Sequence, residues 1–554
     1  MKYPNIPLAQ SIIQLCKAKG IVHIVISPGS RNAPLTIGFT KDSFFKCYSV
    51  VDERCAAFFG LGIAQQTGHP VALVCTSGSA LLNYYPAVAE AFYSETPLVV
   101  LSADRPKNLI NIGDGQTINQ KEVFSNHSLY SANLCEDDLE NNDLEINKAL
   151  NSAIISKGPV HVNVPFKEPL YNTTNDLLVN PIIRPPVLNK EVVDHGLLKK
   201  IALRWSSSKK KMILVGVNAP HSISKEWLNT LAKDDSVIVF TETTSNMNHP
   251  NFFPNIDKII SPLTSKEMEM LRPDILLTFG GLIVSKKIKA FLRKFQPKHH
   301  WHIDELKANN TFFCLEHHIK LSPNEFFDTI FQHSISTIIS NYKPMLNNVK
   351  NDRSKKHDSY LKSVSFSDLK VFDIVINELP QDIILQLSNS ATVRYAQLFD
   401  LDKSVEVFCN RGTSGIDGST STAIGCAVVS KKQTFLVTGD LSFFYDSNAL
   451  WNNYIPNNFR IILINNSGGG IFRILPGKND TKIFDTFFET KHNLTAKQLC
   501  KMFNMTYLTA STSNELQEAM SILKKDNKAP ILLEIFTPST INDQVLLDYF
   551  EFIA

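Results

Sequence analysis

Thr434-Phe-Leu-Val-Thr-Gly-Asp-Leu-Ser442 and Ile461-Ile-Leu-Ile-Asn-Asn466 are the two segments that decide the fold class of this chain. Each begins as a short apolar run and ends abruptly in polar residues, which is the pattern of a strand buried on both faces of a parallel sheet. Ligands of such sheets bind just beyond the carboxyl ends of the strands. The two segments therefore predict buried parallel strands with a ligand site at their ends.

Runs of the same kind recur along the chain, separated by helical patterns long enough for crossover helices. The expected strands are 21–26, 71–74, 98–101 and 160–164 in a first set, 212–216, 236–240 and 275–279 in a second, and 405–408, 434–437, 461–464 and 531–535 in a third. This alternation of strand and helix predicts an α/β protein with three doubly wound parallel sheets.

Two stretches are expected to be linkers that divide the chain into three parts of similar size. Asn180-Pro-Ile-Ile-Arg-Pro-Pro186 is rich in proline, and 341–358 is polar and charged. The first and third parts echo each other, because Thr76-Ser-Gly78 and Thr438-Gly-Asp440 both follow a strand and a helix of small residues. The echo predicts a repeated α/β unit, and similar packing without common descent is the alternative.

The bulk composition argues against several classes of protein. With 56 Lys and Arg against 53 Asp and Glu, the net charge of +3 is far below the basic excess of nucleic-acid or membrane-surface proteins. No run of about 18 apolar residues occurs, so no transmembrane helix is expected. The nine cysteines form no C-x-x-C pair, which favours free thiols in a reducing compartment, and we expect a cytoplasmic protein.

The polar ends of the two opening segments suit a metal ion and a diphosphate. Asp440 and Asn466 offer carboxylate and carboxamide oxygens, ligands that Mg²⁺ prefers, and Gly439 allows close backbone approach. A helix starting near Ser442 would point its amides at an anion. The arrangement resembles the diphosphate-binding signature of thiamine-diphosphate enzymes, with Leu441 where many of them have glycine. An ordinary helix cap and a turn are the alternative.

A glutamate is also required by such enzymes, to hydrogen-bond N1′ of the cofactor's aminopyrimidine. The candidate is Glu53, just before a helix of small and aromatic residues and ahead of the turn at Gly78. Desolvation would raise the pKa of this carboxyl toward the range useful for proton transfer. An acidic residue at a helix start can also serve only to compensate the helix dipole.

Four further motifs narrow the resemblance to one family. They are Ser27-Pro-Gly-Ser-Arg-Asn-Ala-Pro34, Ala103-Asp-Arg-Pro106, Gly113-x-x-Gln116 and Asn410-Arg-Gly-x-Ser-Gly-Ile-Asp-Gly418. With Gly439-Asp-Leu-Ser442 they resemble the 2-succinyl-5-enolpyruvyl-6-hydroxy-3-cyclohexene-1-carboxylate synthases of menaquinone biosynthesis. The resemblance runs from about Asn5 to the C-terminus; its motifs are specific in the first and third parts and faint in the middle one.

This resemblance implies a domain plan and a reaction. The domains would be a pyrimidine-binding domain at 1–178, a middle, transhydrogenase-III-like domain at 190–342 and a diphosphate-binding domain at 360–554. Members use thiamine diphosphate with Mg²⁺ or Mn²⁺ to join 2-oxoglutarate to isochorismate by conjugate addition with release of CO₂. Both substrates are dicarboxylates, so a pocket rich in Arg and Lys is expected. A homodimer or a dimer of dimers is also expected, because the glutamate-bearing domain of one subunit faces the diphosphate-binding domain of another.

The resemblance also assigns residues, position by position. Cofactor binding is implied for Glu53, which is also catalytic, and for Ser77, Ile416, Gly439, Asp440, Leu441, Ser442 and Asn466. The implied metal ligands are Asp440, Asn466 and the carbonyl of Gly468. Substrate binding is implied for Ser30, Arg31, Arg105, Gln116, Lys286, Lys287, Ser390, Arg394, Arg411, Phe472 and Leu475.

Two positions depart from the family pattern. Gly115 stands where members often have Asn, which moves one contact to the backbone or removes it. Lys287 stands where members have Arg, which replaces a bidentate donor by a single charge.

Three other functions remain open at the level of sequence. An acetolactate-synthase-like carboligase or decarboxylase would act on small monocarboxylic oxoacids, which the arginines of the turns disfavour. A dinucleotide-binding protein is disfavoured because Gly60-Leu-Gly-Ile-Ala-Gln65 lacks the third glycine and lies in a helical pattern. A non-catalytic regulator on this fold would need to have lost the glutamate, and Glu53 is present.

Overall fold

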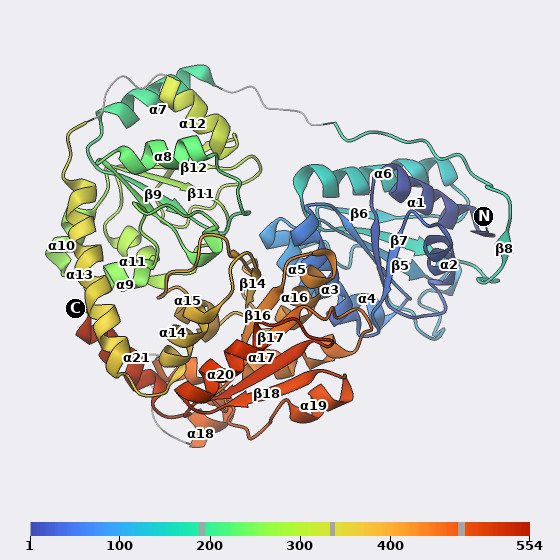
Figure 1. The fold of residues 1–554 in the computed structure, drawn as a ribbon. Helices are drawn as coiled ribbons and strands as arrows, with labels where there is room; N and C mark the ends of the chain where they lie inside the picture. The colour runs from blue at the N-terminus through green and yellow to red at the C-terminus, as the bar shows by residue number, and fades with distance from the viewer. Residues whose placement is uncertain (1, 188–193, 333–337, 475–481) are drawn as a thin grey trace.

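Three parallel sheets organise the protein, each with helices on both faces (Figure 1). The structure is a computed structural model and describes residues 2–187, 194–332, 338–474 and 482–554. The strand orders are β3-β2-β4-β5-β7-β6 in the N-terminal sheet, β10-β9-β11-β12-β13 in the middle sheet and β15-β14-β16-β17-β19-β18 in the C-terminal sheet. The predicted α/β class with doubly wound parallel sheets is therefore confirmed. Among the described residues, no helix is long and apolar enough to cross a membrane.

The N-terminal sheet contains every strand expected in the first part of the chain. Its strands are β2 (His23–Ile26), β3 (Lys46–Ser49), β4 (Val71–Cys75), β5 (Leu98–Asp104), β6 (Tyr130–Asn133) and β7 (Val160–Pro165). Its helices are α1 (Pro7–Ala18), α2 (Ala33–Lys41), α3 (Glu53–Thr67), α4 (Ser79–Asn83), α5 (Tyr85–Ser94), η1 (Lys107–Leu109) and α6 (Leu139–Ser156). A small antiparallel pair, β1 (Tyr3–Pro4) with β8 (Thr173–Thr174), forms a separate two-stranded sheet.

The middle sheet is smaller and lies at the upper left of Figure 1. Its strands are β9 (Lys211–Val215), β10 (Val237–Phe240), β11 (Ile275–Phe279), β12 (His299–Ile303) and β13 (Leu315–Ile319). Its helices are α7 (His195–Ser207), α8 (Lys225–Lys233), η2 (Thr243–Ser245), α9 (Ile256–Ile260), α10 (Ser265–Leu271), α11 (Lys286–Lys294) and α12 (Pro323–Gln332).

The C-terminal sheet repeats the strand order of the N-terminal one, as the echoed motifs predict. Its strands are β14 (Ile384–Leu387), β15 (Glu406–Cys409), β16 (Thr434–Gly439), β17 (Phe459–Asn465), β18 (Thr506–Ala510) and β19 (Ile531–Phe536). Its helices are α14 (Asp368–Glu378), α15 (Ala391–Ala396), α16 (Ser419–Val429), α17 (Asp440–Tyr445), η3 (Ser447–Leu450), η4 (Gly470–Ile474), α18 (Lys482–Phe484), the π-helix η5 (Asp485–Glu489), α19 (Lys497–Met502), α20 (Ser513–Leu523) and α21 (Asn542–Phe552).

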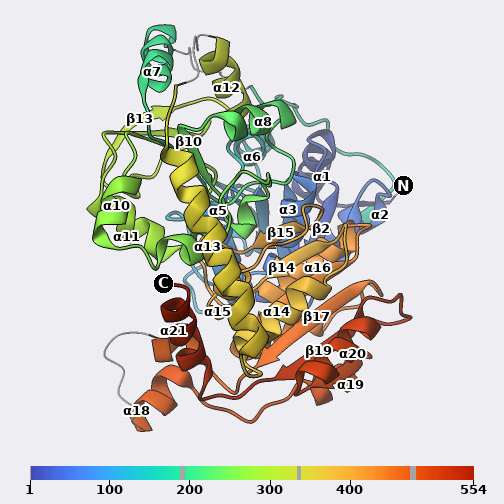
Figure 2. The ribbon, with the colours of Figure 1, turned by 60° about the vertical axis from the view of Figure 1, so that its left-hand side comes forward.

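One of the two expected linkers is wrong. The stretch 341–358 forms most of a long helix, α13 (Tyr342–Ser363), which runs from the middle sheet toward α21 (Figure 2). Its buried residues are Tyr342, Lys343, Leu346, Arg353, His357 and Leu361, which recur largely at helical spacing. Two of these polar side chains have partners on or just after α21, because His357 bonds to the hydroxyl of Tyr549 and Arg353 to the carbonyl of Ile553. The sequence therefore did not reveal this amphipathic helix, because its buried stripe contains charged and polar residues that have partners elsewhere in the fold.

The N-terminal and C-terminal sheets meet through two tightly packed helices. On α3, a Cβ added at Gly62 would lie 2.0 Å from the carbonyl oxygen of Thr422 on α16. On α16, a Cβ added at Gly425 would lie 2.0 Å from the carbonyl oxygen of Phe59 on α3. The small residues that suggested an echo in the sequence thus allow two backbones to touch.

Candidate active site

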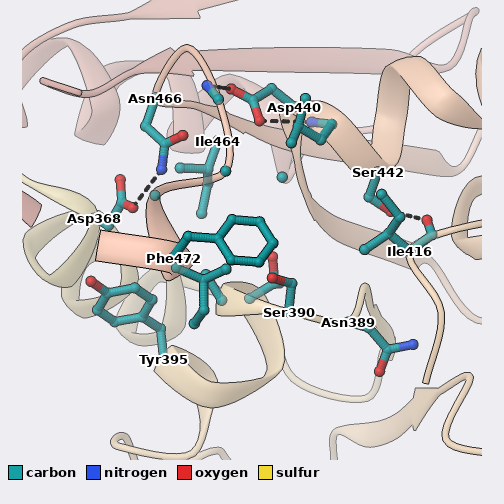
Figure 3. A pocket seen from close by; sticks show the side chains of 18 of the residues that line it. Asp368, Asn389, Ser390, Tyr395, Ile416, Asp440, Ser442, Ile464, Asn466 and Phe472 are labelled. Atoms are coloured by element: carbon teal, nitrogen blue, oxygen red, sulfur yellow. Dashed lines mark hydrogen bonds between the residues drawn. The ribbon is translucent and has the colours of Figure 1, made fainter. Parts of the chain in front are cut away.

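A cavity opens at the carboxyl ends of β16 and β17, where the two opening segments of the sequence lie (Figure 3). Strands β14, β16 and β17 are neighbours in the sheet, so the loops that follow them converge. The cavity is lined by Asp368, Phe372, Asn389, Ser390, Ala391, Thr392, Tyr395, Ile416, Gly439, Asp440, Leu441, Ser442, Ile464, Asn466, Gly468, Gly469, Gly470, Ile471 and Phe472. The structure therefore brings together the residues predicted to hold the metal, most of those predicted for the cofactor, and two predicted for the substrate.

The three predicted metal ligands lie around one corner of this cavity. Asp440 is 3% exposed and accepts hydrogen bonds from the amides of Leu441 at 2.7 Å and Gly468 at 3.0 Å. The Asn466 side chain donates its amide nitrogen to Asp368 at 2.9 Å, which leaves its oxygen for another partner. A carboxylate, a carboxamide oxygen and a backbone carbonyl at this corner fit a divalent cation such as Mg²⁺.

The opposite side of the cavity is formed by the loops after β14 and β15. Ile416 is 36% exposed and lines the cavity, and its carbonyl accepts a hydrogen bond from the hydroxyl of Ser442 at 2.6 Å. Ser390 and Phe472 also line it, and Figure 3 shows both facing the space between Ile416 and Asn466. The predicted residue Leu475 lies outside the described residues.

Two predicted arginines do not line this cavity but contact residues that do. Arg411 is 8% exposed and donates to the amide oxygen of Asn389 at 2.7 Å, and Arg394 donates to the carbonyl of Ser390. Burial and the charge of Arg411 lower the pKa of Arg394. Each arginine is thus held by a neighbour of the cavity, and their charges act on each other.

The remaining cofactor residues lie at the carboxyl ends of the N-terminal sheet. Glu53 is the first residue of α3, and burial raises the pKa of its carboxyl. Ser77 is 1% exposed and donates to the carbonyl of Gln116 at 2.9 Å. In the described part of the chain, none of these three residues lines the cavity at Asp440. The two groups of residues expected to bind the cofactor therefore do not share this cavity within one chain.

The basic residues of the first part form a second group on the same sheet. Arg31, which directly follows the predicted Ser30, is 5% exposed and donates to the carbonyl of Phe166 at 3.0 Å and to Glu168 at 3.2 Å. Burial and the charge of Arg105 lower the pKa of Arg31, so the two guanidinium groups act on each other.

At the first departure from the family pattern, Gly115 in place of Asn, the contact is made by a backbone carbonyl. Arg105 donates to the carbonyl of Gly115 at 3.0 Å, and its guanidinium lies 3.7 Å from Asp114. The residue that lacks an amide side chain therefore still contacts a predicted substrate residue through its carbonyl oxygen.

The middle sheet supplies Lys286 and Lys287 from the start of α11. Lys286 is exposed, whereas the ammonium of Lys287 donates to the hydroxyl of Ser261 and lies 3.5 Å from the ring centroid of Phe550. Burial lowers the pKa of Lys287, with the carboxylate of Asp257 opposing this effect. The second departure thus places its charge against α9 and α21.

Several residues that surround the site were not predicted. Asp368, Asn389 and Tyr395 line the cavity, and His492 lies with its Nε2 atom 3.3 Å from the carboxylate of Asp440. Burial raises the pKa of Asp368 to about 6, and the charge of Asp440 adds to this effect. Asn389 follows β14, a strand interrupted by Gln386 that the apolar pattern missed. Asp368 and His492 lie in no motif, so no signal in one sequence points to them.

The fold and these two surfaces define a class of enzyme that the comparisons with known proteins identify. A model of the thiamine pyrophosphate enzyme, N-terminal TPP binding domain, matches residues 6–124. A model of the thiamine pyrophosphate enzyme, C-terminal TPP binding domain, matches residues 390–535. The chain is a thiamine-diphosphate-dependent enzyme.

Curated relatives identify the particular family within this class. The chain is 56% identical over 554 residues to a 2-succinyl-5-enolpyruvyl-6-hydroxy-3-cyclohexene-1-carboxylate synthase of Flavobacterium johnsoniae, with both chains fully covered. It is similar to those of Flavobacterium psychrophilum, at 57% identity and full coverage, and Bacteroides fragilis, at 38% identity and 97% coverage of both chains. The chain belongs to the family of 2-succinyl-5-enolpyruvyl-6-hydroxy-3-cyclohexene-1-carboxylate synthases.

Proposed function

We propose that this enzyme joins 2-oxoglutarate to isochorismate by conjugate addition with release of CO₂, and so makes 2-succinyl-5-enolpyruvyl-6-hydroxy-3-cyclohexene-1-carboxylate for menaquinone biosynthesis. The observation that carries the proposal is the identity of 56% and 57%, over full length, to two relatives named for that product. Bound thiamine diphosphate supplies the carbanion chemistry of decarboxylation and carboligation. The protein's part is to hold the cofactor, orient the two dicarboxylates and move protons.

The cavity at Asp440 is proposed to hold the diphosphate end of the cofactor. Asp440, Asn466 and the carbonyl of Gly468 bind Mg²⁺ or Mn²⁺, which neutralises the diphosphate. Gly439, Leu441 and Ser442 would contact the same group, and Ile416 would pack against the cofactor rings. The arrangement of these residues around one cavity supports the proposal.

Glu53 and Ser77 are proposed to bind the other end of the cofactor. Glu53 hydrogen-bonds N1′ of the aminopyrimidine and exchanges a proton there, a role that its raised pKa supports. Because these residues lie away from the cavity at Asp440, we propose that a second copy of the chain supplies them, in a homodimer or a dimer of dimers.

The basic residues are proposed to bind the carboxylates of the two substrates. The set is Arg31, Arg105, Lys286, Lys287, Arg394 and Arg411, with Ser30, Gln116 and Ser390 as polar neighbours, and Phe472 and Leu475 as an apolar wall that excludes water. Charge-assisted bonds from several cations to two dicarboxylates support orientation as well as affinity. Lys287 has the weakest support, because its ammonium already contacts Ser261 and Phe550.

The domain plan and the location are also proposals. The pyrimidine-binding domain at 1–178, the middle domain at 190–342 and the diphosphate-binding domain at 360–554 each contain one of the three large sheets. The helix α13 extends beyond the proposed end of the middle domain. The cytoplasmic location rests on the cysteine pattern, and the described cysteines are free thiols.

A reconstituted assay tests the proposed function. The purified chain is incubated with isochorismate, 2-oxoglutarate, thiamine diphosphate and Mg²⁺, and each component is omitted in turn while CO₂ and the adduct are measured. All four are expected to be required. Release of CO₂ from pyruvate in preference to 2-oxoglutarate would instead assign the chain to the acetolactate-synthase-like enzymes.

A further inference from the structure

Two buried glutamates outside the predicted site each bind the backbone of a loop that carries predicted functional residues. Glu90 on α5 is 1% exposed, and Glu242, after β10, is 4% exposed. In the part of the chain that the structure describes, no lysine, arginine or histidine forms an ion pair with either carboxylate. Each carboxyl group instead accepts hydrogen bonds from the donors of one loop.

Glu90 reaches from the N-terminal sheet to the loop between β15 and α16. Its two oxygens accept hydrogen bonds from the amides of Gly412 and Thr413, both at 2.6 Å, and from the hydroxyl of Thr413 at 2.8 Å. A Cβ added at Gly412 would lie 2.3 Å from the carbonyl oxygen of Glu90. The loop therefore lies directly on α5.

This loop begins with Arg411 and contains Ile416. On its other side it is held by Asn389, which donates to the carbonyls of Asn410 and Gly415 at 2.7 Å each, and by Ser442, which donates to Ile416. Those anchors belong to the C-terminal sheet and its loops. Glu90, on helix α5 beside the N-terminal sheet, adds hydrogen bonds from the other side, so the positions of Arg411 and Ile416 depend on both six-stranded sheets and their helices.

Glu242 repeats the arrangement in the middle sheet. One oxygen accepts from the amide of Val284 and the other from the amide of Ser285, both at 2.7 Å. Ser285 is the N-cap of α11, so the next residue is Lys286. The charge of Arg411 acts on Glu242, which places the two anchored loops near each other.

Burial of the Glu90 and Glu242 carboxyl groups has an unfavourable desolvation free energy, which their directional hydrogen bonds to the loops offset. Removing an unpaired carboxylate from water is unfavourable, but the amides of Gly412, Val284 and Ser285 are themselves buried and require an acceptor within the protein. Charge-assisted bonds from two consecutive amides to one carboxylate are short and directional, so they restrict the loop more than water would. Both carboxylates restrict a loop that bears a cation of the proposed substrate pocket.

We infer that Glu90 and Glu242 are positioning residues of the active site, which fix Arg411 and Ile416, and Lys286, through pairs of backbone hydrogen bonds. The inference rests on the proposed function for its substrates. The inference also predicts different effects for the two residues on cofactor binding, because only the loop bound by Glu90 contains a predicted cofactor residue, Ile416.

The test replaces each carboxylate by the isosteric amide, in Glu90→Gln and Glu242→Gln. An amide has one acceptor oxygen, and its NH₂ group would face the second backbone donor, so one bond is lost without a cavity. Loss of such a bond is expected to raise KM for 2-oxoglutarate and isochorismate about tenfold, with a smaller change in kcat. Glu90→Gln is also expected to weaken thiamine diphosphate binding by calorimetry about tenfold, whereas Glu242→Gln changes it less than about twofold.

The matched control is Asp234→Asn. Asp234 pairs with the buried Lys211 at 2.9 Å, at the amino ends of β9 and β10, the edge away from the substrate-binding loops. This variant is expected to lower Tm and leave KM unchanged. Unchanged KM in both glutamine variants, or an equal rise in KM for Asp234→Asn, would overturn the inference.

Two further measurements keep the outcome decisive. Where Glu90→Gln does not fold, Thr413→Val removes only the hydroxyl bond to Glu90 and is expected to shift KM and cofactor affinity about threefold in the same direction. Absence of any shift would also overturn the assignment of Glu90. A wild-type enzyme that releases no CO₂ from 2-oxoglutarate contradicts the proposed function alone, because calorimetry with thiamine diphosphate and Mg²⁺ still compares Glu90→Gln with Glu242→Gln.

Discussion

At the scale of single residues, the hydrogen bonds of two asparagine side chains, Asn466 and Asn389, show how the site is oriented. Asn466 donates a hydrogen bond from its amide nitrogen to Asp368, which leaves its amide oxygen available to the cavity. The amide nitrogen of Asn389 donates to two backbone carbonyls, and its amide oxygen accepts a hydrogen bond from Arg411. At Asn466 the contact with Asp368 therefore defines which end of the amide faces the cavity, whereas both ends of the Asn389 amide are bound within the protein. An exchange of Asn466 to Asp would replace the NH₂ donor by an acceptor oxygen facing the carboxyl of Asp368, and would therefore disturb the site without changing its shape.

The replacement Glu53→Gln tests the proposed proton exchange. A carboxamide can still hydrogen-bond N1′ but cannot take up or release a proton there, so turnover is expected to fall by at least about 10²-fold. Binding of thiamine diphosphate, measured by calorimetry, is expected to change little. An unchanged rate of CO₂ release would contradict the role of Glu53.

Glu242 gives the stability of the protein a pH dependence that can be measured. Burial raises the pKa of this carboxyl from 4.5 to about 7, with Asp257 adding to the effect and Arg411 opposing it; Lys289 is the other charge that faces it. Because the folded state holds the proton more tightly, the stabilisation is complete below pH 4.5 and is lost as the pH rises through 7. The loss is up to about 3 kcal/mol.

The measurement is the difference in Tm between the wild type and Glu242→Gln from pH 5 to pH 8. Glutamine does not titrate, so the wild type is expected to lose Tm relative to the variant as the pH rises across this interval. A difference that stays constant would show that Glu242 does not titrate in this range.

At the scale of elements, the contact between α3 and α16 is the joint of the two six-stranded sheets. Gly62→Ala would place a methyl group 2.0 Å from the carbonyl oxygen of Thr422, a rigid backbone atom. The helices would have to move apart, at a cost of about 3 kcal/mol. The expected result is a lower Tm, with Gly115→Ala as control, because an added Cβ there meets nothing within 4 Å. Equal Tm values for both variants would contradict the tight contact.

The sequence predicted most strands that read as apolar runs, including the edge strands β10 and β15, and missed strands that carry polar residues, both at edges (β6 and β13) and inside the sheets (β12 and β14). Strands such as β5 and β17 have all seven residues buried and therefore read as continuous apolar runs. The edge strands β6, with Tyr130-Ser-Ala-Asn133, and β13, with Leu315-Glu-His-His-Ile319, are only partly buried and carry polar side chains. Helix α13 was missed for a related reason, because charged residues with partners, such as Arg353, occupy its buried stripe.

The candidate site could be predicted where a motif binds a ligand directly, and not where a residue acts through another. Asp440, Asn466 and Gly439 lie in a motif defined by cofactor chemistry, and the structure places them in one cavity. Glu90 contacts Gly412 across 322 residues of sequence, and Asp368 contacts Asn466 across 98. Such contacts depend on the tertiary fold alone, so one sequence contains no local pattern for them.

At the scale of the whole molecule, the repeated sheet order explains why one chain carries two half-sites. The strand ends of the N-terminal sheet present Glu53 and Ser77, and those of the C-terminal sheet present Asp440 and Asn466. Within one chain, α3 and α16 join the sheets through their glycines, and the described lining of the cavity at Asp440 comes from the C-terminal part only. Two copies related by a two-fold axis would complete two sites at once, since an isologous contact pairs each half with its complement.

Mixing two inactive variants tests this arrangement. Glu53→Gln and Asp440→Asn are each expected to inactivate the proposed homodimer, but a mixed dimer that shares sites between subunits would have one site with both changes and one with neither. Co-expression with two different tags is therefore expected to restore about a quarter of the wild-type sites in a random mixture, and about half in mixed dimers purified through both tags. If Glu53 and Asp440 of the same chain served one site, every site of the mixed dimer would contain one change, and the doubly purified protein would be as inactive as either parent.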